Sequence, residues 1–264
     1  QENFEHFEPY LNAAVKRFPI LETAGIRKFF SGPESFTPDT NTLLGEVPEI
    51  KNFFVCCGLN SIGIGSGGGV GKVTAEWLMT GHINEDIFSY DIKRFQKFHS
   101  ELGFIKERIT ESLGDLYGVH WPFKQHKTSR NIKKLPHHES LKSFGACFGV
   151  SGGYERPMWF ALDGEKSEYE YSYNYQNWYP SAEYETNNTI KNVGLFDLTP
   201  FSKFEIISEK AHQELQKICT ANIKNEVGKC SYTQMLNSDG GIETDLTVIC
   251  LDKNYFRIVS SATT

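Results

Sequence analysis

Cysteine pairs at the spacing of metal ligands or redox motifs are missing from this chain. Its six cysteines form no C-x-x-C motif, and the adjacent Cys56 and Cys57 would point to opposite faces of a strand. We therefore expect reduced thiols in a core and a reducing, intracellular compartment. His137 and His138 have no third ligand at metal spacing, so the sequence predicts no metal site.

The chain also lacks a long apolar run and a basic stripe. No stretch of its 264 residues approaches the length needed to cross a bilayer, so we expect no membrane insertion. Charges of both signs are mixed along the sequence and sum to −6, which argues against nucleic acid as a partner. With 39 % hydrophobic residues, the chain can bury a real core, in one large or two modest domains.

A charged or apolar leader is absent as well. The chain starts at Gln1 directly in an amphipathic pattern, and a strand-like run lies close to its other end. These features predict that both ends are cut from something longer.

Apolar periodicity predicts the elements of the first half. A helix covers residues 4–18 and stops at Pro19, and a loop with two prolines and a glycine separates two short strands. A third strand leads through a glycine run into a second helix, which Gly81 ends. The predicted strands are 24–30, 42–47 and 52–57, and the second helix is 70–80.

The second half carries a polar connector followed by mixed elements. The connector runs from about residue 83 to 134, with helix-like stretches at 91–98 and 105–113, and we expect a boundary near Pro136. Beyond it the pattern predicts an α+β (mixed α/β) fold with strands at 201–207, 231–236, 242–251 and 255–260 and a helix at 209–219. Alternating aromatics at 169–179 indicate a strand or extended arm that packs in a core or interface.

Residues 58–71 hold seven glycines in fourteen positions. A G-x-G-x-x-G match inside this run suggests a dinucleotide-binding start, but other elements precede it, and a P-loop is excluded because Ser66 and Val73 stand where glycine and Ser/Thr are required. A close-packed turn without ligand explains one or two glycines but not seven. Helix N-terminal amides aimed at an electron-rich cofactor explain more.

Ordered motifs along nearly the whole chain resemble the sarcosine and dimethylglycine dehydrogenase family. They are GPESFTPD at 32–39, LGEVPE at 44–49, CGLNS at 57–61, YDIKRF at 90–95, IKER at 105–108, SRNIK at 129–133, GYERPMWF at 153–160, FDL at 196–198, FSKF at 201–204, YTQMLN at 232–237 and GGIETDLTV at 240–248. The resemblance implies three parts. Residues 1–82 are the end of an FAD-dependent oxidoreductase domain, 83–135 a connector domain, and 136–264 the first part of an aminomethyltransferase-like folate domain.

In this family the resemblance implies a flavoenzyme that demethylates sarcosine to glycine and passes the one-carbon unit to tetrahydrofolate, with the choice between sarcosine and dimethylglycine as substrate left open. The residues that it implies as FAD contacts are Gly58, Leu59, Asn60, Ser61, Ile62 and Gly63. Asp245 holds the position of the acidic residue that acts on folate as a general acid/base. From the residues alone, Asp245 is equally a solvent-facing strand residue behind a Gly240-Gly241 turn.

The same resemblance implies a mitochondrial matrix protein with electron-transfer flavoprotein as electron acceptor. The N-terminal dinucleotide fingerprint, the flavin-linking histidine and part of the folate site would lie outside this piece, so we expect it alone neither to retain FAD nor to oxidise sarcosine. Two other interpretations stay open. A non-catalytic regulatory subunit of pyruvate dehydrogenase phosphatase resembles the same architecture, whereas a stand-alone aminomethyltransferase explains only the residues after about Pro136.

Overall fold

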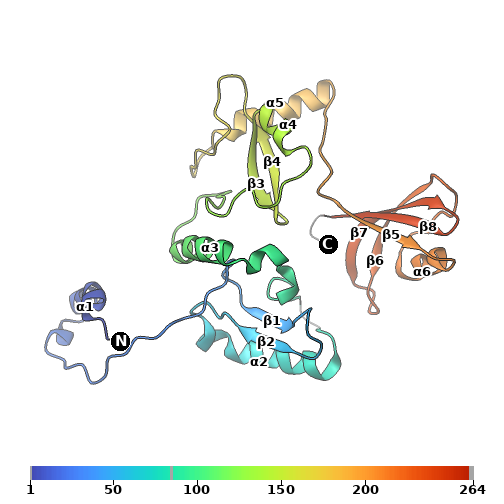
Figure 1. The fold of residues 1–264 in the computed structure, drawn as a ribbon. Helices are drawn as coiled ribbons and strands as arrows, with labels where there is room; N and C mark the ends of the chain where they lie inside the picture. Colours follow the sequence, from blue (N-terminus) through green and yellow to red (C-terminus); the bar gives the residue numbers. More distant parts are fainter. Residues whose placement is uncertain (1, 84–85, 262–264) are drawn as a thin grey trace. The chain divides into compact units, whose positions relative to one another are not determined.

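The computed structural model describes residues 2–83 and 86–261, and it divides into two units, Gln1–Gly118 and Val119–Thr264. Both units mix helices with antiparallel strands (Figure 1). The predicted α+β class is therefore confirmed. No helix among the described residues is both long and apolar enough to cross a membrane.

The first unit begins with helix α1 (Phe4–Arg17), which confirms the predicted helix. The Asn3 side chain accepts a hydrogen bond from the amide of His6 and caps it, and a 3₁₀ helix at Pro19–Glu22 follows. The predicted strand at residues 24–30 is wrong, because this segment has no neighbouring strand to pair with in the described structure. Its Phe29 packs instead against the ring of Phe4, 4.5 Å between centroids.

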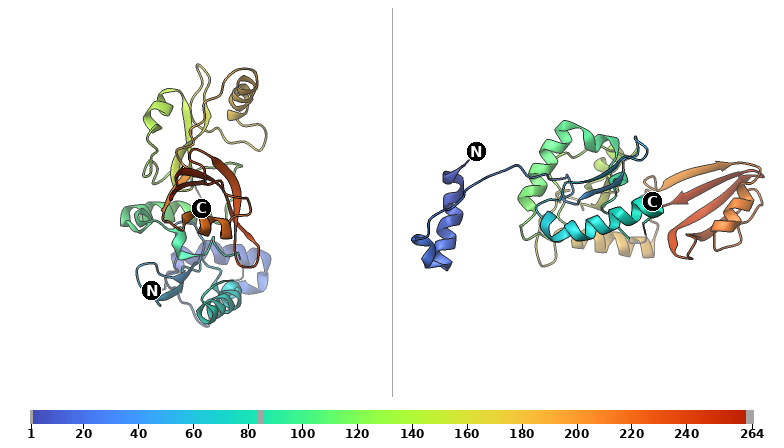
Figure 2. Two further views of the ribbon diagram at one scale, coloured as in Figure 1. Left: turned by 90° about the vertical axis from the view of Figure 1, so that its right-hand side faces the viewer. Right: turned by 90° about the horizontal axis from the view of Figure 1, so that it is seen from below.

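Strands β1 (Leu43–Glu46) and β2 (Phe54–Cys57) form an antiparallel hairpin and confirm two predicted strands. Helix α2 (Gly63–Thr80) packs on it through the buried Trp77, whose ring meets Phe54 edge-on at 5.6 Å. Figure 2 shows α2 as one continuous helix. It starts seven residues earlier than predicted, so most of the glycine run is helical. As predicted, it ends at Gly81, which has a left-handed φ of 78°.

The connector segment is built from short helical pieces. The 3₁₀ helices η2 (Ile92–Arg94) and η3 (Lys97–Ser100) replace the longer helical stretch predicted at 91–98, and helix α3 (Leu102–Asp115) contains the one predicted at 105–113. Leu44 of β1 donates its amide to the carbonyl of Tyr90, so this segment is fastened to the hairpin.

Gly45 gives the first testable prediction for this unit. Its φ is 118°, and a Cβ there would lie 2.4 Å from Cη2 of Trp77. Gly45→Ala is therefore expected to lower the free energy of unfolding by about 2 kcal/mol, because it combines backbone strain with overpacking. Gly71→Ala in α2 is the control: no neighbour lies within 4 Å, so alanine should stabilise the helix by about 0.5–1 kcal/mol. Urea unfolding followed by circular dichroism measures both, and shifts of the same sign would contradict the prediction.

The second unit starts with a hairpin between two helices. Helix α4 (His138–Ser143) precedes strands β3 (Ala146–Ser151) and β4 (Tyr154–Phe160), and helix α5 (Trp178–Lys191) follows. The aromatic run at 169–179 is no strand: it is irregular until α5 begins, with the rings of Tyr169 and Tyr171 stacked at 5.5 Å. Neither the hairpin nor α5 was predicted from the sequence.

A buried ion pair ties the preceding segment to this hairpin. Glu155 is 2 % exposed, and its carboxylate accepts from Arg130 Nε at 2.7 Å and from Arg130 Nη2 at 2.6 Å. The Asn131 amide donates to the same carboxylate at 2.7 Å. Arg130 also donates to the carbonyls of His126 and Phe148, so the segment and the hairpin share one polar network.

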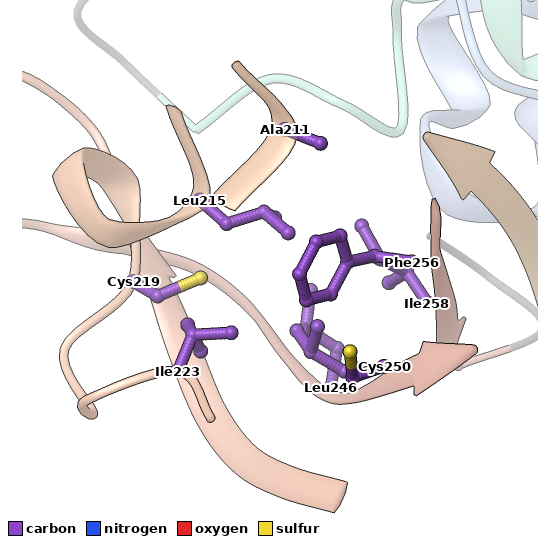
Figure 3. Close-up of a cluster of buried hydrophobic side chains, with 9 residues drawn as sticks. Ala211, Leu215, Cys219, Ile223, Leu246, Cys250, Phe256 and Ile258 are labelled. Carbon is purple, nitrogen blue, oxygen red and sulfur yellow. The ribbon is translucent and has the colours of Figure 1, made fainter. Parts of the chain in front are cut away.

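The last part is a four-stranded antiparallel sheet in the order β5-β8-β7-β6. Its elements are β5 (Ser202–Ile207), α6 (Ala211–Ile218), β6 (Cys230–Leu236), β7 (Ile242–Asp252) and β8 (Tyr255–Ser260), all close to the predicted ranges. Leu215 of α6 faces Phe256 and Leu246 in a fully apolar core (Figure 3). Alternate residues of β7 therefore point to this core, and those between them point away from it.

All six cysteines are free thiols, but the prediction that they lie in a core is wrong for half of them. Cys147, Cys219 and Cys250 are buried. Cys56, Cys57 and Cys230 are exposed. Burial raises the pKa of Cys147 to about 11, so that thiol stays protonated at neutral pH.

Candidate functional site

The turn between β2 and α2 has an unusual backbone. Gly58, Asn60 and Ser61 all have left-handed φ values, 63°, 46° and 65°, and the helix starts two residues later at Gly63. A Cβ at Gly58 would lie 2.6 Å from Cγ2 of Thr37, so only glycine fits there. The sequence signal for this turn was the glycine at its start and the Asn-Ser pair that follows.

Asn60 fixes the turn from inside. It is 3 % exposed, and its Oδ1 accepts from the amide of Thr37 at 2.9 Å, while its Nδ2 donates to the carbonyl of Gly58. The backbone amide of Asn60 donates a hydrogen bond to the carbonyl of Ser35 at 3.2 Å. Asn60 was predicted as an FAD contact. In the structure its polar groups form hydrogen bonds within the protein, and these bonds support the turn.

Beyond the turn, the first turn of α2 presents backbone amides. A helix leaves its first amides without an intrahelical acceptor, here those of Gly63, Ile64 and Gly65, and the first helical bond closes from Ser66 to the Ile62 carbonyl at 2.9 Å. A side chain at Gly65 would meet nothing within 4 Å. This end of an 18-residue helix therefore combines positive potential with room for close approach.

These observations fit the edge of a flavin. The reduced ring carries negative charge at its pyrimidine side, which oriented amides and a helix dipole stabilise. Of the predicted contacts, Gly58 and Asn60 are buried, whereas Ser61 and Ile62 are exposed. Sequence reasoning missed Glu34, whose carboxylate accepts a hydrogen bond from Ser61 Oγ, because the two lie 27 positions apart.

Asp245 lies on a different element, strand β7, on the face opposite the apolar core. Its neighbours Leu246 and Val248 are buried, so the strand alternation turns Asp245 outward, where it is exposed. Tyr232 of β6 donates its hydroxyl to Asp245 Oδ2 at 2.8 Å. A carboxylate anchored through one oxygen can accept an N–H at the other, so the site fits the amine edge of a folate.

Tyr232 was not predicted as a site residue, although the strand register brings it diagonally beside Asp245. The hydrogen bond to Asp245 raises the pKa of Tyr232, because a phenolate would lose the bond and face a carboxylate. In Asp245→Asn we expect Tyr232 to ionise at lower pH than in the parent chain. NMR of ¹³C-labelled tyrosine measures this, with Tyr232→Phe to assign the signal; an unchanged titration would contradict the hydrogen bond.

Among the described residues, no group of three or more His, Cys, Asp and Glu is placed to hold a metal ion. His138 is buried and its ring stacks on Phe148 at 4.0 Å between centroids. Burial lowers the pKa of His138, as expected of a neutral histidine in an aromatic environment.

Three family models match successive parts of the chain. Residues 1–77 match the FAD dependent oxidoreductase family, residues 80–134 its central domain, and residues 137–264 the GCVT N-terminal domain. Together these domains imply FAD and tetrahydrofolate as cofactors.

Curated relatives match nearly the whole chain. A 4-methylaminobutanoate oxidase (formaldehyde-forming) of Paenarthrobacter nicotinovorans is 40 % identical over 99 % of this chain and 32 % of its own length. Human mitochondrial sarcosine dehydrogenase is 34 % identical over 93 % of this chain and 30 % of its own. The mouse regulatory subunit of pyruvate dehydrogenase phosphatase is 33 % identical over 98 % of this chain and 30 % of its own length.

The chain thus spans about a third of the length of these relatives. The matched domains and their order are those that the sequence motifs indicated. The chain is thus a homologue of the sarcosine and dimethylglycine dehydrogenases, and it carries matches to FAD dependent oxidoreductase and GCVT N-terminal domains.

Proposed function

We propose that a full-length protein carrying this chain oxidatively demethylates an N-methyl amino acid, with sarcosine as substrate and glycine as product, and passes the one-carbon unit to tetrahydrofolate. The observation that carries this proposal is the left-handed turn at Gly58–Ser61, which delivers free amides at the start of α2. Dimethylglycine and 4-methylaminobutanoate, in the names of two relatives, share the same N-methyl amine and carboxylate. The substrate class is therefore N-methyl amino acids, and within it we propose sarcosine.

The residues of the turn act by position. When bound, FAD supplies the two-electron oxidation of the N-methyl carbon, which leaves an imine for water or folate to trap. The backbone of residues 58–63 would hold the flavin, and the amides of Gly63 and Ile64 would favour its negatively charged, reduced form. A Cβ at Gly65 would meet nothing within 4 Å, which leaves room for the ring, whereas a Cβ at Gly63 would lie 3.0 Å from Cδ1 of Leu59.

Asp245 acts on the folate side. As the folate amine forms its bond to the one-carbon unit, the carboxylate, held by Tyr232, accepts the amine's proton as a general base, and as a general acid it then donates this proton to the nitrogen of the departing glycine. Its exposed place on β7 leaves it open to a ligand. The alternative, a solvent-facing strand carboxylate without function, predicts no effect of its removal on transfer.

The domain boundaries, the compartment and the electron acceptor are proposed from the family. We place the end of the FAD-dependent oxidoreductase domain at residues 1–82, the connector domain at 83–135 and the first part of the folate domain at 136–264. Sarcosine and dimethylglycine dehydrogenases of mammals are named as mitochondrial. We propose that this protein also lies in the mitochondrial matrix and that it passes its electrons to an electron-transfer flavoprotein. The bacterial relative makes localisation a separate question for experiment.

The test is anaerobic bleaching of flavin absorbance in the full-length protein, titrated separately with sarcosine, dimethylglycine and 4-methylaminobutanoate. Bleaching by sarcosine at the lowest concentration supports the proposal as stated. Bleaching by one of the other two at lower concentration keeps the reaction and corrects the substrate.

A second candidate function has its own support. The regulatory subunit of pyruvate dehydrogenase phosphatase is as similar to this chain as sarcosine dehydrogenase, within one percentage point of identity. If the full-length protein is purified without flavin, or if its flavin responds to none of the three amines, a non-catalytic regulator becomes the better interpretation.

A further inference from the structure

Arg94, in the segment that matches the central domain, uses every donor of its guanidinium inside the first unit. The side chain is 9 % exposed. Nε and Nη2 bind the two carboxylate oxygens of Asp39 at 2.6 and 3.1 Å, and Nη2 also donates to the Asn41 carbonyl at 2.9 Å. Nη1 donates to the carbonyls of Tyr90 and Asp91 at 2.8 and 3.1 Å. Five donors therefore meet five acceptors.

Three of these acceptors, the two carboxylate oxygens of Asp39 and the Asn41 carbonyl, belong to the loop that supports the turn at 58–61. Thr37 is 2 % exposed, and its hydroxyl lies 3.1 Å from Asp39 Oδ1 and 2.8 Å from the Asn41 carbonyl, both acceptors for its one proton. The Thr37 amide donates to Asn60 Oδ1. A continuous path of hydrogen bonds thus runs from Arg94 through Asp39 and Thr37 to Asn60.

Each step of this path is charge-assisted or buried, so it resists competition from water. A second bond fastens the same loop to α3, where Ser112 Oγ donates to the Pro38 carbonyl at 2.7 Å. The turn itself has two non-glycine residues with left-handed φ, Asn60 and Ser61, a conformation that persists only where its surroundings hold it. The surroundings here are supplied in part by residues 90–94, which lie about thirty positions beyond the turn.

We propose that Arg94 is a positioning residue: through Asp39, Thr37 and Asn60 it fixes the turn at 58–61 and so aims the first amides of α2. The proposal rests on the proposed function for its consequence at the flavin. Well-aimed amides stabilise the reduced, negatively charged ring more than the oxidised one, so loosening the turn makes the flavin harder to reduce. Arg94 thereby lets the central domain set the reduction potential without touching the cofactor.

Arginine is required here because of its shape. A lysine carries the charge but only three donors on one atom, and it cannot bind both oxygens of Asp39 and three carbonyls at once. Arg94→Lys should therefore retain the conformation of the turn only in part, whereas a purely electrostatic role would let lysine retain it fully.

The experiment compares the full-length protein with Arg94→Met, Arg94→Lys and the matched control Arg257→Met. Arg257 forms an ion pair with Glu205 at 2.7 Å on the exposed sheet, in the other unit. Hydrogen exchange of a peptide covering residues 54–66 measures the turn, and equilibration with redox dyes measures the flavin potential. In Arg94→Met we expect about tenfold faster exchange, from loss of a charged hydrogen bond, and a more negative potential. Arg257→Met should change neither.

The outcomes separate this inference from the proposed function. Unchanged exchange in Arg94→Met overturns the positioning role, even if the parent oxidises sarcosine. Faster exchange with an unchanged potential overturns the link to the flavin. A flavin-free parent overturns the proposed function, while the exchange measurement still decides whether Arg94 fixes the turn. If Arg94→Met does not fold, Asp39→Asn, which keeps one acceptor for Arg94, should give the same two changes at smaller size.

Discussion

Replacing Glu155 with glutamine is expected to lower the free energy of unfolding of the second unit by about 3 kcal/mol. The carboxylate is 2 % exposed and accepts two short bonds from Arg130. Glutamine has nearly the same shape, but its amide group presents donors to a guanidinium that needs acceptors. Arg130 would then remain largely buried, its side chain 22 % exposed, without a counter-ion.

The control is Glu139→Gln in the same part of the chain. Glu139 pairs with Lys134 at 2.9 Å, but both side chains are exposed, so the unfolding midpoint should stay unchanged. Urea unfolding followed by tryptophan fluorescence compares the two, since Trp159 is buried on β4. Equal midpoints for Glu155→Gln and the parent would show that the ion pair contributes nothing net.

The pH dependence provides an independent check. Burial alone raises the pKa of Glu155, but the bonds from Arg130 and the Asn131 amide outweigh it and hold the pKa below its ordinary value. A carboxyl with a depressed folded pKa contributes stability above its unfolded pKa of about 4.3, and this stability is lost as the pH falls through the folded pKa. The difference between parent and Glu155→Gln should therefore be constant near neutrality and shrink below about pH 4.

Local patterns were enough for the final sheet. Alternation in 242–251 and the Gly240-Gly241 turn are properties of neighbouring residues, and β6, β7 and β8 lie within a residue or two of the predicted ranges. Local propensity failed for α2, because glycine is a poor helix former and the pattern indicated a turn until Val70. The C-terminal half of the helix is anchored on the β1–β2 hairpin by Trp77, a contact that no local window contains.

The residues of the site also divide into those that local sequence predicts and those that only the fold brings together. The turn and Asp245 could be found from motifs, because the residues that form them are contiguous or follow a recognisable turn. The groups that hold the turn could not be found, since Glu34 and Ser61, and Arg94 and Asp39, lie 27 and 55 positions apart. Such pairs leave no periodic signal, and only the fold brings them together.

Asp245→Asn in the full-length protein is expected to slow transfer of the one-carbon unit to tetrahydrofolate by about 100-fold, the lower end of what a positioned acid/base contributes. Asparagine keeps the size of the side chain and can still accept from Tyr232, so the strand and its register should be retained. It cannot take up a proton from the folate amine. The oxidation of sarcosine does not use this carboxylate, so flavin bleaching by sarcosine should proceed at the parent rate.

The variant therefore separates two steps that a steady-state assay combines. In a single anaerobic turnover with tetrahydrofolate present, the parent should deliver its one-carbon unit to folate, whereas Asp245→Asn should release it as formaldehyde when water traps the imine. Asp239→Asn, on the exposed loop between β6 and β7, is the matched control and should behave as the parent. If Asp245→Asn also delivers its one-carbon unit to folate at the parent rate, Asp245 is only an outward-facing residue of β7, and the proton must be moved by another group.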